Sequence, residues 1–267
     1  MNFYPTIDVE QMELALMVAE DLQPEQAPLV PGLLALRQIR ASVVEQISVQ
    51  QTEAARIEQL GRIFYQTLGF AVDDEGYFHP DNCLLSLVLQ RRRGNPLTLG
   101  ILLLHLARTL EIPADGICFP GQFLLRLGAE AKAVILDPLD GQHLDRHGLE
   151  WRLRGVQGNL ARLTADHLQG ASQTAILHRL LTVAKGSYLQ ARLLPQALRC
   201  SELLLILHPD DPYEVRDRGL VYQQLECDQQ AVNDLQYFIA HCPTDPARGL
   251  LQEQVTRLQQ RAPTTFH

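Results

Sequence analysis

The chain has 267 residues, of which 46% are hydrophobic and 20% are charged, a composition typical of a globular protein with one large or two modest domains. Its formal net charge of −8 argues against nucleic-acid binding, which depends on clustered Lys and Arg side chains. Five cysteines without a CxxC pair indicate reduced thiols in a cytoplasmic protein. The acidic N-terminal segment is not a signal peptide, and the apolar run at residues 97–104 is too short to cross a bilayer. We therefore expect neither a nucleic-acid nor a membrane partner.

Residues 9–68 show apolar side chains at the three- and four-residue intervals of a helix. The prolines of residues 24–31 are expected to separate the first helix from the second. Small strands are expected near residues 69–78, and Asp81-Asn82 is predicted to cap a helix that ends near Gly94. The arginine run just before Gly94 is predicted to be a solvated helix end.

A long central helix is predicted for residues 96–110, because Asn95 is a good N-cap and proline is favoured at the first helical position. Pro113 is expected to end this helix. Three apolar runs of strand length follow, at residues 116–119, 122–127 and 133–136. We expect a small antiparallel sheet that packs on the helix, which gives this part of the chain a helix-rich α+β fold.

The last hundred residues repeat with a period of 34. Identical residue types separated by that interval are Tyr188 and Tyr222, Ala197 and Ala231, Pro209 and Pro243, Asp211 and Asp245, and Pro212 and Pro246. A helix–turn–helix unit of this length resembles the tetratricopeptide repeat. Gly219 matches that family's small residue in the second copy, whereas Lys185 stands in its place in the first. With a capping helix at residues 247–260, this α-helical tail is predicted either to stabilise the protein or to bind a partner.

The segment RGNPLTLGILLLHLARTLEIPADG, followed by PGQFLLRL and ILDPLDG, resembles the active-site region of the transglutaminase-like superfamily. In that superfamily a cysteine opens a long apolar helix, a strand then brings a histidine, and a further strand brings an aspartate. The resemblance places Pro96 at the cysteine position, Gln122 at the histidine position and Asp137 at the acidic position. It implies a papain-related core in which one of the three catalytic positions is filled.

Thiol catalysis needs a thiolate, whose pKa is lowered by a helix N-terminus and a neighbouring imidazolium, and an acidic group that orients the imidazole. Pro96 carries no nucleophile. Gln122 forms hydrogen bonds but does not titrate, so it cannot act as a general base. Asp137 has no histidine to orient, and Asp-Pro after an apolar run is equally consistent with an ordinary exit from a strand.

The chain as a whole resembles the bacterial SirB-type family of transglutaminase-like proteins with C-terminal tetratricopeptide repeats. The resemblance rests on the motifs RxGNPLTLG, PGQF and LDPLDG in this order, followed by HPDDPYEVRDRGLVY at residues 208–222. It implies a transglutaminase-like domain with a helical N-terminal part at residues 1–165 and helical repeats at residues 170–262. It also implies a regulatory role and brings no defined reaction.

We therefore predict a non-catalytic protein that acts by binding a protein or peptide. Its vestigial cleft would be formed by Asn95, Pro96, Gln122 and Asp137, and the amides of Asn95 and Gln122 would hydrogen-bond the backbone of an extended segment. A different possibility is that side chains fill this cleft and only the tail interacts.

The alternative is a hydrolase or acyl transferase of the papain or transglutaminase type with an unrecognised nucleophile. Thr98 and Ser86 are the hydroxyls closest to the core motif, and Cys118 is the nearby thiol. His105 follows Thr98 by two helical turns. Cys118 lies in a predicted strand, where a buried small hydrophobic residue is the favoured interpretation.

No cofactor or metal is predicted. The sequence has neither the Walker nor the Rossmann glycine pattern. His143 and His147 have the four-residue spacing of a metal-binding pair on one helix face, but no third ligand accompanies them. A solvated loop or the start of a helix is the favoured interpretation of this segment.

Overall fold

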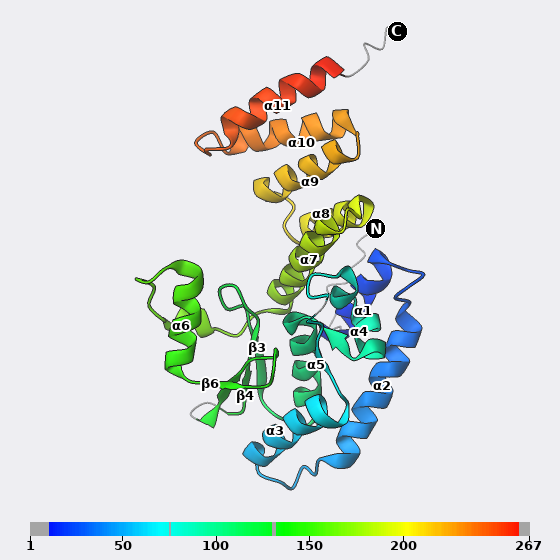
Figure 1. Ribbon diagram of the computed structural model, residues 1–267, viewed down its shortest axis with the longest axis vertical. Helices are drawn as coiled ribbons and strands as arrows, with labels where there is room; N and C mark the ends of the chain where they lie inside the picture. The colour runs from blue at the N-terminus through cyan, green and yellow to red at the C-terminus, as the bar shows by residue number, and fades with distance from the viewer. Residues whose placement is uncertain (1–10, 75, 130–131, 262–267) are drawn as a thin grey trace. The chain divides into compact units, whose positions relative to one another are not determined.

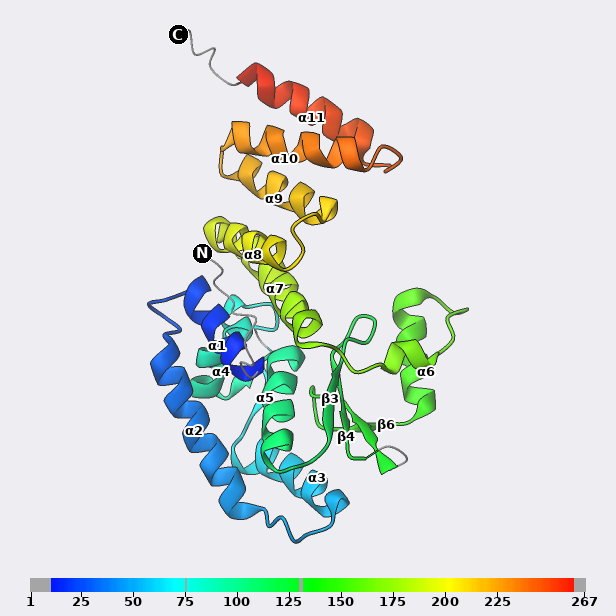
Figure 2. The same ribbon diagram turned by 180° about the vertical axis from the view of Figure 1, so that it is seen from behind.

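The computed structural model describes residues 11–74, 76–129 and 132–261. The chain divides into two compact units, residues 1–180 and 181–267, and the division falls inside helix α7 (Gln173–Gln190). Figures 1 and 2 show the elements of both units from opposite sides. No helix within the described ranges combines the length and the apolar character that a bilayer-spanning segment needs.

Three helices open the first unit, as the apolar spacing predicts. They are α1 (Gln11–Leu22), α2 (Leu29–Gln46) and α3 (Glu53–Arg62). Pro31 lies in the first turn of α2, where a residue without an N–H is tolerated, so the prediction that it separates the first two helices is wrong. Thr52 caps α3 by accepting a hydrogen bond from the Ala55 amide. Residues 9–10, where the helical pattern starts, lie outside the described residues.

A short parallel pair precedes the central helix. β1 (Ala71–Val72) pairs with β2 (Arg93–Gly94), and α4 (Leu85–Arg91) lies between them in the chain. A single 3-10 turn, Pro80–Cys83, comes before α4. The predicted cap at residues 81–82 therefore belongs to this turn, and α4 is shorter than the pattern suggests.

The central helix α5 (Pro96–Thr109) lies within one residue of the predicted bounds. Asn95 Oδ1 accepts a hydrogen bond from the Thr98 amide at 3.0 Å, and Thr98 Oγ1 accepts one from the Asn95 amide at 3.2 Å. This reciprocal capping box satisfies two amides at the helix start. Every residue from Leu97 to Ala107 is buried, as expected for a helix that is apolar all round.

Four antiparallel strands form the sheet of the first unit in the order β3-β4-β5-β6. Their bounds are Ala114–Ile117, Leu124–Leu127, Val134–Leu136 and His143–Leu144. Both views place α5 on one side of this sheet and α6 (Arg146–Gln157) on the other (Figures 1 and 2). Ile117 and Leu124 of the sheet form a buried cluster with Leu149 and Leu153 of α6. Strand β6 was not predicted from the sequence, whereas the start of α6 agrees with one of the two interpretations of the segment after Gly141, the start of a helix.

Five helices carry the repeats of the chain's last part. After α7 they are α8 (Leu194–Leu207), α9 (Pro212–Gln224), α10 (Asp228–His241) and α11 (Arg248–Arg261). The repeated Tyr188, Ala197 and Ala231 are all fully buried. Asp211 caps α9 by accepting hydrogen bonds from two backbone amides. Ala197 and Ala231 therefore occupy equivalent buried positions, each the fourth residue of its helix, whereas Tyr222 is half-buried and Pro246 precedes α11 instead of starting it as Pro212 starts α9.

The small position of the repeat differs between the two copies. A Cβ at Gly219 would lie 2.9 Å from the Cβ of Asp234, so glycine permits the close approach of α9 and α10. At the equivalent place in the first copy, the Lys185 ammonium contacts Glu214 Oε2 at 2.7 Å and Asp217 Oδ2 at 3.1 Å. A buried ion pair therefore takes the place of close packing in this copy.

Candidate functional site

Asn95 and Pro96, the first two predicted site residues, form the start of α5. Asn95 is 5% exposed, its Oδ1 takes part in the capping box, and its Nδ2 lies 3.4 Å from Cys83 Sγ. A bound chain could therefore use only the second N–H of Asn95 Nδ2 without breaking one of these contacts. Pro96 occupies the first helical position, where proline is favoured in any helix, so its place needs no functional explanation.

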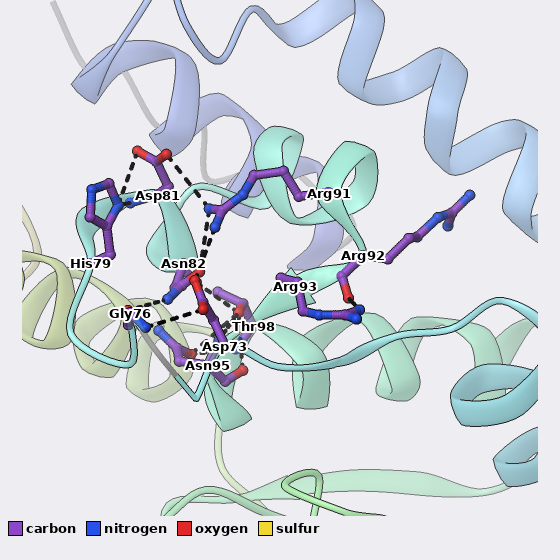
Figure 3. Close-up of polar contacts among 10 residues, drawn as sticks. All are labelled: Asp73, Gly76, His79, Asp81, Asn82, Arg91, Arg92, Arg93, Asn95 and Thr98. Atoms are coloured by element: carbon purple, nitrogen blue, oxygen red, sulfur yellow. Dashed lines mark hydrogen bonds and ion pairs between the residues drawn. The ribbon is translucent and has the colours of Figure 1, made fainter.

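A polar network holds this helix start in place (Figure 3). Asn82 is fully buried. Its side-chain amide donates a hydrogen bond to the Gly76 carbonyl at 2.7 Å, and its main-chain carbonyl accepts one from Thr98 Oγ1 at 2.8 Å. Arg91 Nη2 donates to Asp73 Oδ2 at 2.9 Å. Burial raises the pKa of Asp73, but hydrogen bonds from Asn82, the Gly76 amide and Arg91 outweigh it, so the pKa lies below its usual value. The polar atoms beside α5 are thus engaged in structural contacts.

The other two arginines of the basic run also contact the protein. Arg93 Nη1 donates to the Gly69 carbonyl at 2.9 Å, and the Arg92 guanidinium lies 4.7 Å from the centre of the Phe70 ring. Burial lowers the pKa of Arg92. Arg91 and Arg93 remain exposed, as the prediction of a solvated helix end requires.

Gln122 and Asp137 meet at one end of the sheet, where Arg152 of α6 joins them. Gln122 lies in the turn before β4, and Asp137 directly follows β5. Arg152 Nη1 donates to Gln122 Oε1 at 2.9 Å and forms an ion pair with Asp137 Oδ2. The Asp137 and Arg152 side chains are 5% and 17% exposed. A fixed cation therefore bridges the positions that the sequence assigns to a histidine and its acid.

Sequence reasoning missed Arg152, although a signal for it exists. Leu149 and Leu153 are the buried residues of α6, and Arg152 stands three residues after one and directly before the other. These spacings place Arg152 at the edge of the buried helix face. An arginine there needs a buried partner, and Asp137 was already a candidate.

The start of α5 is directed toward this end of the sheet. A Cβ at Gly100 would lie 2.6 Å from the Phe123 ring and 3.0 Å from Pro138 Cγ. Gly100 follows Pro96 by four positions and so shares its helix face. The residues that follow Gln122 and Asp137 thus pack one turn beyond Pro96.

Two tyrosines lie near the acidic member of the site. Tyr65 Oη donates to the Pro138 carbonyl at 3.1 Å, and its pKa is raised by burial and then by the charges of Asp137 and Asp140. Burial and the charge of Asp137 also raise the pKa of Tyr77. Both phenols therefore stay protonated near neutral pH and cannot serve as bases there.

The alternative nucleophiles are in unsuitable surroundings. Thr98 and Ser86 are fully buried, and their hydroxyls donate to main-chain carbonyls. Burial raises the pKa of Cys118, which Arg179 only partly offsets, so this thiol is mostly protonated at neutral pH. His105 lines a cavity of about 280 Å³ together with side chains of α1 and α2.

His143 and His147 do not share a helix face. His143 belongs to strand β6, and His147 belongs to α6, so the helical spacing considered for a metal pair is wrong. His143 lines a cavity of about 320 Å³ with Tyr65, Leu136 and Asp140. Within the described parts of the chain, no three His, Cys, Asp or Glu side chains gather in a group suited to hold a metal ion.

Comparison with known proteins agrees with this architecture. The transglutaminase-like superfamily profile matches residues 33–182, and the tetratricopeptide repeat profile matches residues 184–256. No solved structure matches the chain.

Several bacterial proteins are similar over most of their length. A UPF0162 protein of Vibrio cholerae is 45% identical over 219 residues, covering 82% of this chain and 81% of that protein. Protein SirB1 of Salmonella typhimurium is 37% identical over 216 residues, covering 80% of each chain. A UPF0162 protein of Buchnera aphidicola subsp. Acyrthosiphon pisum is 31% identical and covers 98% of each.

Proposed function

The chain belongs to the transglutaminase-like superfamily, in the group of bacterial proteins that includes SirB1, and from this premise we propose that it acts by binding and not by catalysis. Its degenerate active site, comprising Asn95, Pro96, Gln122, Asp137 and the bridging Arg152, holds an extended protein or peptide segment. The bound segment leaves the site unmodified.

The observation that carries this proposal is the position of Arg152. Its guanidinium contacts Gln122 and Asp137, where the working enzymes of the superfamily need an imidazole between a nucleophile and an acid. A guanidinium remains protonated in proteins, so it cannot accept a proton from an attacking group. Pro96 offers no group to attack with. The residues at these positions therefore favour a site that has kept a binding role and lost its catalytic one.

Exposed apolar side chains around the ion pair support the same proposal. Tyr77 and Leu139 are 43% and 42% exposed, and Trp151 and Val156 are 72% and 56% exposed. Tyr77 and Leu139 are tied to the site, because the charge of Asp137 acts on Tyr77 and the Leu139 amide donates to Asp137 Oδ1. Val156 follows Arg152 by four positions and shares its helix face, whereas Trp151 lies on the solvent side of α6, opposite the buried Leu149 and Leu153. Val156 lies against Gly121. Aromatic side chains beside an arginine are the composition of binding hot spots.

The test is selection of random short peptides on the immobilised full-length chain, followed by affinity measurement of the selected peptides. Trp151 is the only tryptophan of the chain, so its fluorescence reports on binding near α6 in the wild type. Affinities of the wild type and the variants are compared by isothermal titration calorimetry, because the site variant lacks this tryptophan. We expect the double variant Tyr77→Ala and Trp151→Ala to bind the selected peptides at least about tenfold more weakly, because exposed hot-spot aromatics typically contribute more than about 1 kcal/mol each.

A matched control is Leu34→Ala with Val44→Ala on α2, since these side chains are also about half exposed, at 54% and 48%, and lie outside the site. This control should bind like the wild type. Equal losses of affinity in both double variants would move the function to another surface. The same conclusion would follow if the peptides bound a tail variant such as Tyr213→Ala poorly and the site variant normally. Failure to select any peptide would count against binding of extended segments altogether.

A further inference from the structure

The Arg152 guanidinium has an edge that the protein does not use. Both hydrogen bonds of Arg152 come from Nη1, one to Gln122 and one to Asp137. Among the described residues, neither its Nε nor its Nη2 donates a hydrogen bond. The side chain is 17% exposed. Because guanidinium presents paired N–H donors that match the two oxygens of a carboxylate, this second edge is suited to an acidic ligand.

The amide of Gln122 adds donors beside that edge. Arginine can only donate hydrogen bonds, so the oxygen of Gln122 must face Arg152 and its NH₂ group must point away from it. Gln122 is partly exposed, and no acceptor for its Nε2 is found in the described part of the chain. The neighbouring side chains Arg152 and Gln122 thus present N–H donors without matching acceptors.

The local charge is more favourable to an anion than the charge of the chain as a whole. Residues 137–162 contain four arginines and four acidic residues, whereas the whole chain carries a net charge of −8. On α6 itself, Arg146 and Arg154 both pair with the same Glu150, at 3.1 and 3.3 Å. An acidic ligand is therefore repelled less here than by most of the remaining surface.

We propose that Arg152 and Gln122 form a carboxylate-binding site, which on the proposed binding function makes the partner an acidic segment with apolar neighbours. Arg152 Nε and Nη2 take the two carboxylate oxygens, and Gln122 Nε2 donates to one of them or to an adjacent carbonyl. Trp151 and Val156 contact the apolar side chains that flank the acid. The carboxylate belongs either to an Asp or Glu side chain or to the C-terminus of the partner.

Three short peptides distinguish these sources in an NMR titration of the full-length chain. The first is acetyl-Leu-Glu-Leu-amide, the second is acetyl-Leu-Gln-Leu-amide, and the third is acetyl-Leu-Gln-Leu with a free C-terminus. The signals followed are the side-chain amide of Gln122, Nε–H of Arg152 and the indole N–H of Trp151. We expect saturable shifts with at least one of the carboxylate peptides, and at least about tenfold weaker binding of the uncharged one, the difference expected for a charge-assisted hydrogen-bonded pair.

The decisive variant is Gln122→Glu, which keeps the shape of the side chain and replaces its donor group with an oxygen. It should remove binding of the carboxylate peptides. The control Arg154→Gln takes one positive charge from the exposed face of the same helix and should leave the affinity within about twofold. Equal binding of charged and uncharged peptides, or equal losses in both variants, would overturn the proposal.

A response of the same three signals to anionic lipid vesicles but not to the peptides would also overturn it. If the library selection yields peptides without acidic residues that still depend on Tyr77 and Trp151, the binding function stands and the carboxylate site alone is refuted.

Discussion

Replacing Arg152 by methionine should destabilise the first unit by about 3 kcal/mol. The substitution leaves the buried Asp137, which is 4% exposed, without its counter-ion. Among the described residues, its carboxylate then keeps the hydrogen bond from the Leu139 backbone amide. Removing one member of a buried ion pair costs about 3–5 kcal/mol, and the partial exposure of Arg152 favours the lower end. The assay is urea unfolding followed by circular dichroism, combined with hydrogen exchange of peptides that cover β5 and α6.

Two companion variants make this prediction refutable. Adding Asp137→Asn to Arg152→Met removes the uncompensated charge and should recover about half of the loss. Arg154→Met is the matched control, because this exposed arginine of α6 has only a surface pair, and it should change stability by less than about 0.5 kcal/mol. A loss below that limit for Arg152→Met, or a double variant no more stable than the single one, would contradict the assigned role of the bridge.

Three further predictions concern other parts of the chain. Gly100→Ala should lower the free energy of urea unfolding by about 1–3 kcal/mol, because the added Cβ meets the core. Gly61→Ala, which has open space around it, should instead stabilise α3 by up to about 1 kcal/mol. Similar effects of the two substitutions would be inconsistent with the packing described. Lys185→Met should destabilise the repeats by about 3 kcal/mol, since it leaves the buried Glu214 unpaired, and Glu214→Gln in the same background should partly restore the melting temperature. The depressed pKa of Asp73 contributes stability above the ordinary pKa of about 4, and this contribution is lost as the pH falls through the lower folded-state pKa. Asp73→Asn should therefore lower the unfolding free energy at neutral pH and have a smaller effect as the pH falls below about 4, and an effect that does not change with pH would refute this assignment.

The elements with a local signal were predictable from the sequence. The cap at Asn95, the proline after it and the apolar run define α5, and the 34-residue period defines the repeats. By contrast, β6 has two residues, too few for a period-two pattern, and it is recognisable only through its pairing with β5. The π-helical turn Ile63–Thr67 that extends α3 likewise has no sequence signature.

The site was predictable in part for the same reason. Gln122 and Asp137 were found through motif order and meet in the structure, but the residue that joins them comes from α6 and is separated from Asp137 by a strand and a turn. Long-range ion pairs of this kind leave no periodic trace in a single sequence. Lys185 is a second example of such a long-range pair. In the sequence, a charged residue at the small position of the repeat indicates a degenerate copy, and its role is recognisable only from the contact with Glu214.

The proposed function requires that the degenerate site binds a segment without altering it. The most direct test incubates the wild-type chain with an excess of a library-selected peptide and follows both by mass spectrometry, while the Trp151 signal reports the complex. We expect the peptide to be recovered at its original mass and the chain to gain no covalent adduct. A cleaved or transferred peptide, or an acyl adduct on any side chain, would show that the chain is an enzyme and contradict the proposed binding function.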